Sequence, residues 1–82
     1  MDFVKLEEAQ GKGLISEHEV VDIKILELEK VSNELKKNHV WGDWENWRKF
    51  INMDIQVNEL KIRKLELDNQ LYKETLEKFK DY

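Results

Sequence analysis

The feature that most constrains this chain is the segment from Asp43 to Tyr82, which contains neither glycine nor proline. Apolar residues recur in it every three or four positions, which is the spacing of one face of an α-helix. Because both residue types that break helices are absent from this segment, it predicts one continuous helix over residues 43–80. A helix with so long an apolar face needs a second surface to cover that face.

Two apolar stripes run side by side along this segment. The first keeps a heptad rhythm that only Lys64 interrupts, and the second adjoins it and contains Ile51, Ile55, Ile62 and Tyr72. Together the stripes are wider than the seam of a simple coiled coil, so they predict a core and a contact between subunits. The residues predicted for this core and oligomer contact are Phe50, Met53, Val57, Leu60, Leu65, Leu67, Leu71, Leu76 and Phe79.

A second helix is predicted over residues 16–39. Ser16 and Glu19 have the spacing of a capping box, in which each residue bonds the backbone N–H of the other. Ile15 and Val20 stand where a hydrophobic staple packs across the start of a helix. These local signals make Ser16 the expected N-cap.

A short helix is predicted before this one, over residues 2–10, with Asp2 as its N-cap. The two glycines of residues 11–13 then favour a hinge. A tight turn over residues 40–42 leads to Asp43, the expected N-cap of the long helix. The whole chain of 82 residues is expected to form a single helical domain.

Helix lengths suggest how these elements pack. At 1.5 Å per residue the long helix spans roughly 57 Å and the second helix roughly 36 Å. If they fold back at Gly42, the long helix overhangs its partner, and the first helix is expected to cover the overhang. That arrangement places Phe3 near Phe79 and Leu6 near Leu76. The expected fold is therefore an all-α antiparallel hairpin in which the two shorter helices form one broken arm against the long helix.

The same register places Val57 near Ile25 and Glu19 near Arg63. A two-armed hairpin still buries only part of each apolar face. The remaining stripe is expected to be covered by a second copy, which gives a homodimer or higher assembly of the coiled-coil or four-helix-bundle type.

Composition narrows the classes of function. The chain has 18 acidic and 14 basic residues and a net charge of −4, which is unfavourable for binding a phosphate backbone. It has no cysteine, and no stretch approaches the roughly 20 apolar residues of a membrane span. We therefore expect a cytoplasmic protein without a membrane partner and consider a nucleic-acid partner unlikely.

Signals of catalysis or metal binding are weak. The only aliphatic hydroxyls are Ser16, Ser32 and Thr75, and there is no glycine-rich phosphate loop. The sequence Glu17-His18-Glu19 could contact a metal, but successive helical residues point about 100° apart, so a solvated helix start is expected instead. The sequence predicts no catalytic residue, no metal site and no cofactor.

The most distinctive side chains gather at the predicted turn. Trp41, Trp44 and Trp47 are spaced by three, and His39 and Arg48 lie beside them. Tryptophans can plug the open end of a helical bundle, and they are also enriched in binding hot spots. Trp47 is expected to act as the plug. The candidates for partner binding are Trp41, Trp44, His39 and Arg48.

These observations favour a non-enzymatic helical module for protein–protein interaction, an adaptor or inhibitor that acts as a homo-oligomer. The architecture resembles that of small accessory proteins of phages, plasmids and bacteria, which by itself implies no activity. The alternative is a nucleic-acid-associated bundle that uses the Lys, Arg and Trp residues near the turn, since aromatic and basic side chains together can bind single strands. A metal-binding or enzymatic bundle is the third possibility.

Overall fold

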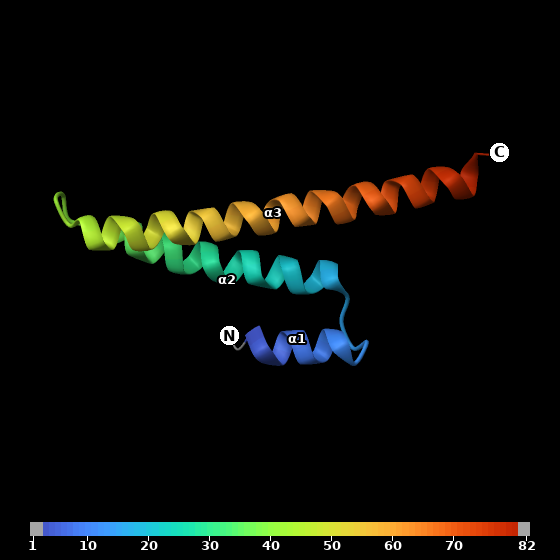
Figure 1. Ribbon diagram of the computed structural model, residues 1–82, viewed down its shortest axis with the longest axis horizontal. Helices are drawn as coiled ribbons and strands as arrows, with labels where there is room; N and C mark the ends of the chain where they lie inside the picture. The colour runs from blue at the N-terminus through green and yellow to red at the C-terminus, as the bar shows by residue number, and fades with distance from the viewer. Residues whose placement is uncertain (1–2, 81–82) are drawn as a thin grey trace.

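The computed structural model describes residues 3–80, which contain three α-helices and no strand (Figure 1). Helix α1 spans Phe3–Gly11, α2 spans Glu17–Lys37 and α3 spans Trp44–Phe79. The predicted all-α fold is thereby confirmed, as is the packing of α2 against α3. The expected cap Asp2 lies outside the described residues.

Helices α2 and α3 both begin at the cap residues that the sequence indicates. The Ser16 hydroxyl accepts a hydrogen bond from the Glu19 backbone N–H at 3.2 Å. The Asp43 carboxylate accepts one from the Asn46 backbone N–H at 3.1 Å. Between the helices, Gly42 has a φ of +91°, a conformation that costs a residue with a Cβ atom but not glycine. The chain therefore reverses, and α2 and α3 lie antiparallel (Figure 1).

The core of this hairpin is small. Val21, Ile25 and Val57 form a buried cluster, which brings Val57 and Ile25 together as the expected register requires. Partly buried leucines pack against it from both helices, namely Leu28, Leu60 and Leu67. Val20 is also buried, next to the start of α2. The core therefore consists mainly of β-branched side chains, of which Val57 comes from α3 and the others come from α2.

Ion pairs between α2 and α3 hold the same register. Two nitrogens of Arg63 donate to the carboxylate of Glu17 at 2.7 and 2.9 Å. Lys61 pairs with Glu29 at 2.7 Å, farther toward the turn. The expected register placed Glu19 near Arg63, but Arg63 bonds Glu17 across the hairpin and Glu66 on its own helix. The Glu19 carboxylate accepts a hydrogen bond from the Ser16 hydroxyl at 3.2 Å.

The position of α1 corrects the expectation of a broken arm. Helix α1 folds back along α2 and does not continue toward the free end of α3 (Figure 1). Lys24 of α2 pairs with Glu7 of α1 at 3.0 Å, and its ammonium group lies 5.5 Å from the centre of the Phe3 ring. Phe3 therefore lies near the middle of the hairpin, so the predictions that placed Phe3 near Phe79 and Leu6 near Leu76 are wrong.

The cause of this reversal lies in the glycine segment. The Leu14 N–H donates to the Ala9 carbonyl and the Gly13 N–H donates to the Gln10 carbonyl, both at 3.0 Å. These two bonds, with Gly13 at a φ of +74°, form a Schellman motif, which caps α1 and turns the chain sharply. The segment is thus a specific chain reversal, and it cannot align α1 with α2 along one arm.

The last part of α3 consequently extends past α2 (Figure 1). The molecule is elongated, with principal extents of 60 × 27 × 14 Å. We call residues 69–79 of α3 the overhang. Its apolar side chains Leu71, Tyr72 and Leu76 are 56–72% exposed.

The residues predicted for core and oligomer contact fall into three groups. Val57 is buried, and four others are half-buried: Phe50, Met53, Leu60 and Leu67. The rest are exposed in the single chain, namely Leu65, Leu71, Leu76 and Phe79. One chain therefore encloses the half of the set nearer the turn and leaves the other half in contact with solvent.

Candidate functional site

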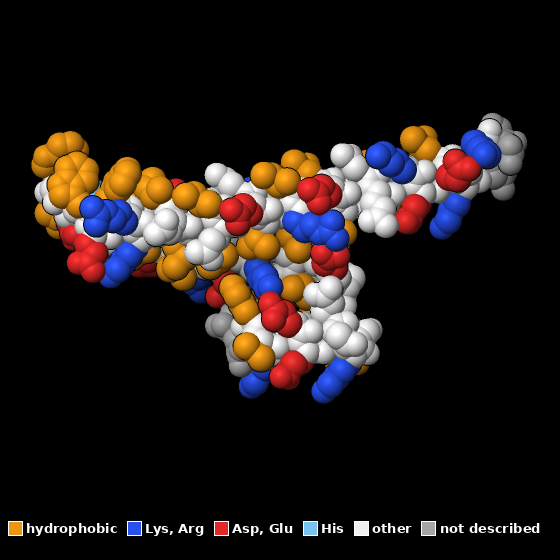
Figure 2. Space-filling model, in the orientation of Figure 1, with side chains coloured by type: hydrophobic (Ala, Val, Ile, Leu, Met, Phe, Trp, Pro, Cys, Tyr) orange, Lys and Arg blue, Asp and Glu red, His pale blue; other side chains and the backbone are white. Residues whose placement is uncertain are grey.

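The turn between α2 and α3 presents three indole rings to solvent. Trp41 is 90% exposed, Trp44 60% and Trp47 41%. The ring centres of Trp41 and Trp44 lie 6.4 Å apart, and those of Trp44 and Trp47 lie 6.2 Å apart with planes at 81°. Figure 2 shows apolar side chains gathered at this end of the molecule. We call these three residues the tryptophan cluster.

The expectation that Trp47 plugs the end of the hairpin is wrong for the single chain. The inward position is taken by Asn46, whose side-chain amide donates to the Leu35 carbonyl and lies 3.1 Å from the Nδ1 atom of His39. The edge of the His39 ring packs on Phe50 with centres 5.3 Å apart. Trp47 follows Asn46 directly, so it points about 100° away around the helix.

The two remaining partner-binding candidates have different environments. His39 is half-buried because its ring contacts Asn46 and Phe50, so it supports the turn from within. Arg48 is exposed on the first turns of α3, close in sequence to Trp44 and Trp47. The turn therefore offers a partner three indole rings and a guanidinium group.

One basic residue close to the turn, the exposed Lys36, already has partners within the hairpin. Lys36 pairs with Asp54 at 2.8 Å, and its ammonium group lies 5.9 Å from the centre of the Phe50 ring. Asp54 also accepts a hydrogen bond of 2.6 Å from the buried hydroxyl of Ser32. The hydrogen bonds from Lys36 and then Ser32 lower the pKa of the Asp54 carboxyl.

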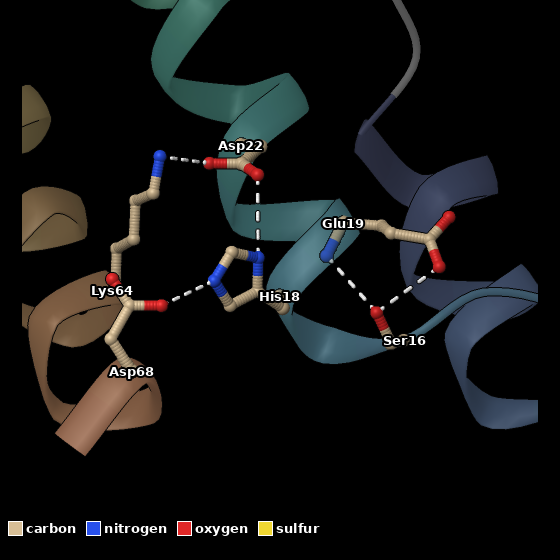
Figure 3. A network of polar contacts seen from close by, with 6 residues as sticks. All are labelled: Ser16, His18, Glu19, Asp22, Lys64 and Asp68. Carbon is tan, nitrogen blue, oxygen red and sulfur yellow. Dashed lines mark hydrogen bonds and ion pairs between the residues drawn. The ribbon is translucent and has the colours of Figure 1, made fainter. Parts of the chain in front are cut away.

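A second polar cluster joins the start of α2 to α3 (Figure 3). The His18 ring lies between two carboxylates, with Nε2 2.7 Å from Asp68 and Nδ1 3.3 Å from Asp22. Lys64 completes the cluster by pairing with Asp22 at 2.7 Å. His18 is thus not simply a solvated helix start. The spacing of His18 and Asp22 was a usable signal, but Asp68 could be assigned only once the helix register was known.

The charges in this cluster support one another. The hydrogen bond to Asp68 is the main cause that raises the pKa of His18, and the charge of Asp22 contributes. The hydrogen bond from Lys64 lowers the pKa of Asp22. Within residues 3–80, no group of three or more His, Asp or Glu side chains is arranged to hold a metal ion. The cluster therefore acts as a charged clasp between α2 and α3.

No known protein family, curated protein or solved structure matches this sequence. None of the helices described over residues 3–80 combines the length and apolar character needed to cross a membrane. What the chain does must therefore be argued from its own surface.

Proposed function

We propose that this chain is a non-enzymatic helical module for protein–protein interaction, an adaptor or inhibitor that acts as a homo-oligomer. One observation carries the proposal. Among the described residues, four apolar side chains are buried, whereas fifteen large apolar side chains are exposed. Many large apolar side chains are therefore available for association.

Association would complete a core that one copy leaves small. Domains of this size bury a smaller fraction of their surface than larger ones, and an added subunit is a common remedy. Full burial of one leucine contributes about 1.5–3 kcal/mol, so covering Leu65 and Leu76 alone would be a large gain for a small domain. The proposed oligomer therefore supplies both stability and a defined assembly.

The tryptophan cluster is the proposed surface for a protein partner. Large aromatic residues and arginine are enriched in binding hot spots, and both types are exposed at this turn. Trp41 is the main contact in this proposal because its ring is 90% exposed and is therefore not needed to fill the hairpin. Trp44 and Arg48 would flank it.

The test compares two alanine variants in affinity capture from the native host. Trp41→Ala should melt close to the parent, because its ring is exposed, yet lose the captured partner. Val40→Ala is the matched control, since Val40 is an exposed apolar neighbour, and it should retain the partner. Equal capture by the parent and both variants would contradict the role given to Trp41.

Single-stranded nucleic acid is the second candidate ligand for the same surface. Exposed basic residues lie beside the indole rings at Lys37, Arg48 and Lys49, which is a combination that binds single strands. Against it, Lys36 is paired with Asp54 and the whole chain carries a net charge of −4. Binding to an oligonucleotide that weakens steeply with salt would favour this alternative over a protein partner.

A further inference from the structure

The face of α3 that α2 leaves uncovered carries a regular heptad repeat. Its apolar members are Ile51, Ile55, Ile62, Leu65, Tyr72 and Leu76. All of these except the half-buried Ile51 are 49–72% exposed. Two exposed polar residues, Asn58 and Asn69, fill the remaining positions, so the spacing alternates strictly between four and three from Ile51 to Leu76. We call these eight positions the outer seam.

The outer seam is distinct from the face of α3 that packs on α2. Val57 marks the packed face because it is buried in the hairpin core. At about 100° per residue, Leu65 lies roughly 80° from Val57 around the helix axis and Ile62 roughly 140°. Figure 2 shows apolar side chains along the edge of α3 that is turned away from α2. Neither α1 nor α2 covers this edge.

We propose that the outer seam pairs with the same seam of a second copy, in parallel and in register, as a two-stranded coiled coil. This inference rests on the homo-oligomer of the proposed function and specifies its geometry. In heptad terms the a positions are Ile55, Ile62, Asn69 and Leu76, and the d positions are Ile51, Asn58, Leu65 and Tyr72. The central pair therefore has isoleucine at a and leucine at d. β-Branched residues at a with leucine at d favour two parallel strands, and one asparagine at an a position fixes register.

The charges beside the seam fit this arrangement. In a parallel coiled coil, each g residue approaches the e residue five positions later in the other helix. Lys61 thus approaches Glu66 of the second copy, and Asp68 approaches Lys73 of the second copy. Symmetry repeats both contacts, so four attractive pairs flank the centre of the seam. Lys61 and Asp68 also keep partners within their own hairpin, namely Glu29 and His18, both at 2.7 Å.

One flanking pair joins like charges, namely Asp54 with Glu59 of the second copy. Lys36 and Ser32 already contact Asp54 within its own hairpin, at 2.8 and 2.6 Å, and this lessens the repulsion. Symmetry repeats this contact too, so four attractive pairs, which surround Ile62, Leu65 and Asn69, stand against two repulsive ones. A second copy of the chain is the occupant that this charge pattern fits.

Parallel pairing has a consequence for the partner-binding surface. Both copies of α3 would begin at the same end, so the two tryptophan clusters would lie side by side and present a two-fold surface. In the antiparallel register that matches Asn58 with Asn69 of the second copy, the clusters would instead lie at opposite ends. The two arrangements differ most for Leu76, whose two copies are adjacent in one and more than about 30 Å apart in the other.

Disulfide cross-linking distinguishes these arrangements, because the chain has no cysteine of its own. The variant Leu76→Cys should cross-link to itself under mild oxidation, since facing seam positions lie within the distance that a disulfide spans. The matched control is Gln70→Cys, which is exposed on the same part of α3 but lies off the seam. The expected yield of cross-linked dimer is about tenfold higher for Leu76→Cys than for Gln70→Cys.

A second experiment oxidises a mixture of Ile51→Cys and Leu76→Cys. A third measures the mass of the parent chain by light scattering. Cross-linking of position 51 only to position 76 would overturn the parallel arrangement in favour of the antiparallel one. Equal yields at positions 70 and 76 would overturn the seam itself. A parent chain that is dimeric but fails to cross-link through Leu76→Cys and Leu65→Cys would refute this inference alone, whereas a monomeric parent would refute the proposed function as well.

Discussion

The two halves of α3 have the same kind of sequence but different surroundings. The half nearer the turn packs on α2 through Ile25 and Val57 and is tied to it by pairs such as Glu29 with Lys61. The overhang also carries apolar residues at helical spacing, yet Leu71 and Leu76 are more than half exposed. α3 is therefore helical both where α2 covers it and where it does not. What differs between the two parts is whether the apolar face is buried or exposed to solvent.

The largest expected effect comes from placing a charge in the covered half. Val57→Asp would place a carboxylate against the apolar side chains of Val21 and Ile25 in the centre of the small core, and burying a charge there is costly. We expect this variant to lose most of its cooperative thermal unfolding, followed by circular dichroism. A variant that melts like the parent would show that the α2–α3 core is not what holds the chain together.

The matched change in the overhang should act through association. Leu76→Asp places the same charge on a side chain that is 72% exposed in the single chain, so it should harm the hairpin less than Val57→Asp does. We expect the melting temperature to become independent of protein concentration, because the interface rather than the hairpin is damaged. If the melting temperature of Leu76→Asp still rose with concentration as that of the parent does, the overhang would not be part of the interface.

A smaller effect is expected from deleting one hydroxyl that contacts each half, namely Ser32 of α2, which bonds the half nearer the turn, and Thr75 in the overhang. Ser32 is only 2% exposed and donates to Asp54, so Ser32→Ala should lower the melting temperature by about 5 °C. Thr75 in the overhang is exposed and donates only to the Leu71 carbonyl of its own helix. Thr75→Ala should therefore shift the melting temperature by no more than about 2 °C. Equal shifts would erase the contrast between the two halves.

The smallest expected effect is a dependence on pH at the border between the halves. Folding raises the pKa of His18 through Asp68, so its stabilising contribution is complete below the ordinary histidine pKa of about 6.5. That contribution is lost as pH rises through the higher pKa of the folded state. The melting temperature of the parent should fall slightly from pH 6 to pH 8.5, and His18→Gln should remove this fall. A parent and variant with identical pH profiles would show that the clasp does not contribute.

Sequence patterns predicted the features that depend on local chemistry. The caps Ser16 and Asp43 act through bonds to residues three positions away, so their spacing in the sequence was sufficient. The contact of Ile25 with Val57 followed from helix geometry once the turn at Gly42 was placed. These predictions needed no knowledge of the rest of the fold.

Features that depend on chain direction could not be obtained in this way. The position of α1 depends on the Schellman motif at Gly13. A pair of glycines in the sequence indicates a hinge, but it does not indicate the direction in which the chain continues after it. Asn46 and His39 close the end of the hairpin, and Trp47 does not. The reason is the direction of each side chain, because Asn46 faces His39 and the next residue, Trp47, points about 100° away around the helix. The clasp of His18 with Asp68 joins residues fifty positions apart.

The central claim is that one copy of this chain is an incomplete folding unit whose exposed apolar faces are covered by another copy. Light scattering across a range of micromolar concentrations, with melting measured on the same samples, tests it most directly. We expect a mass at least twice the chain mass of 10.0 kDa and a melting temperature that rises with concentration. A mass of 10.0 kDa at every concentration, with one unchanging melting temperature, would contradict it.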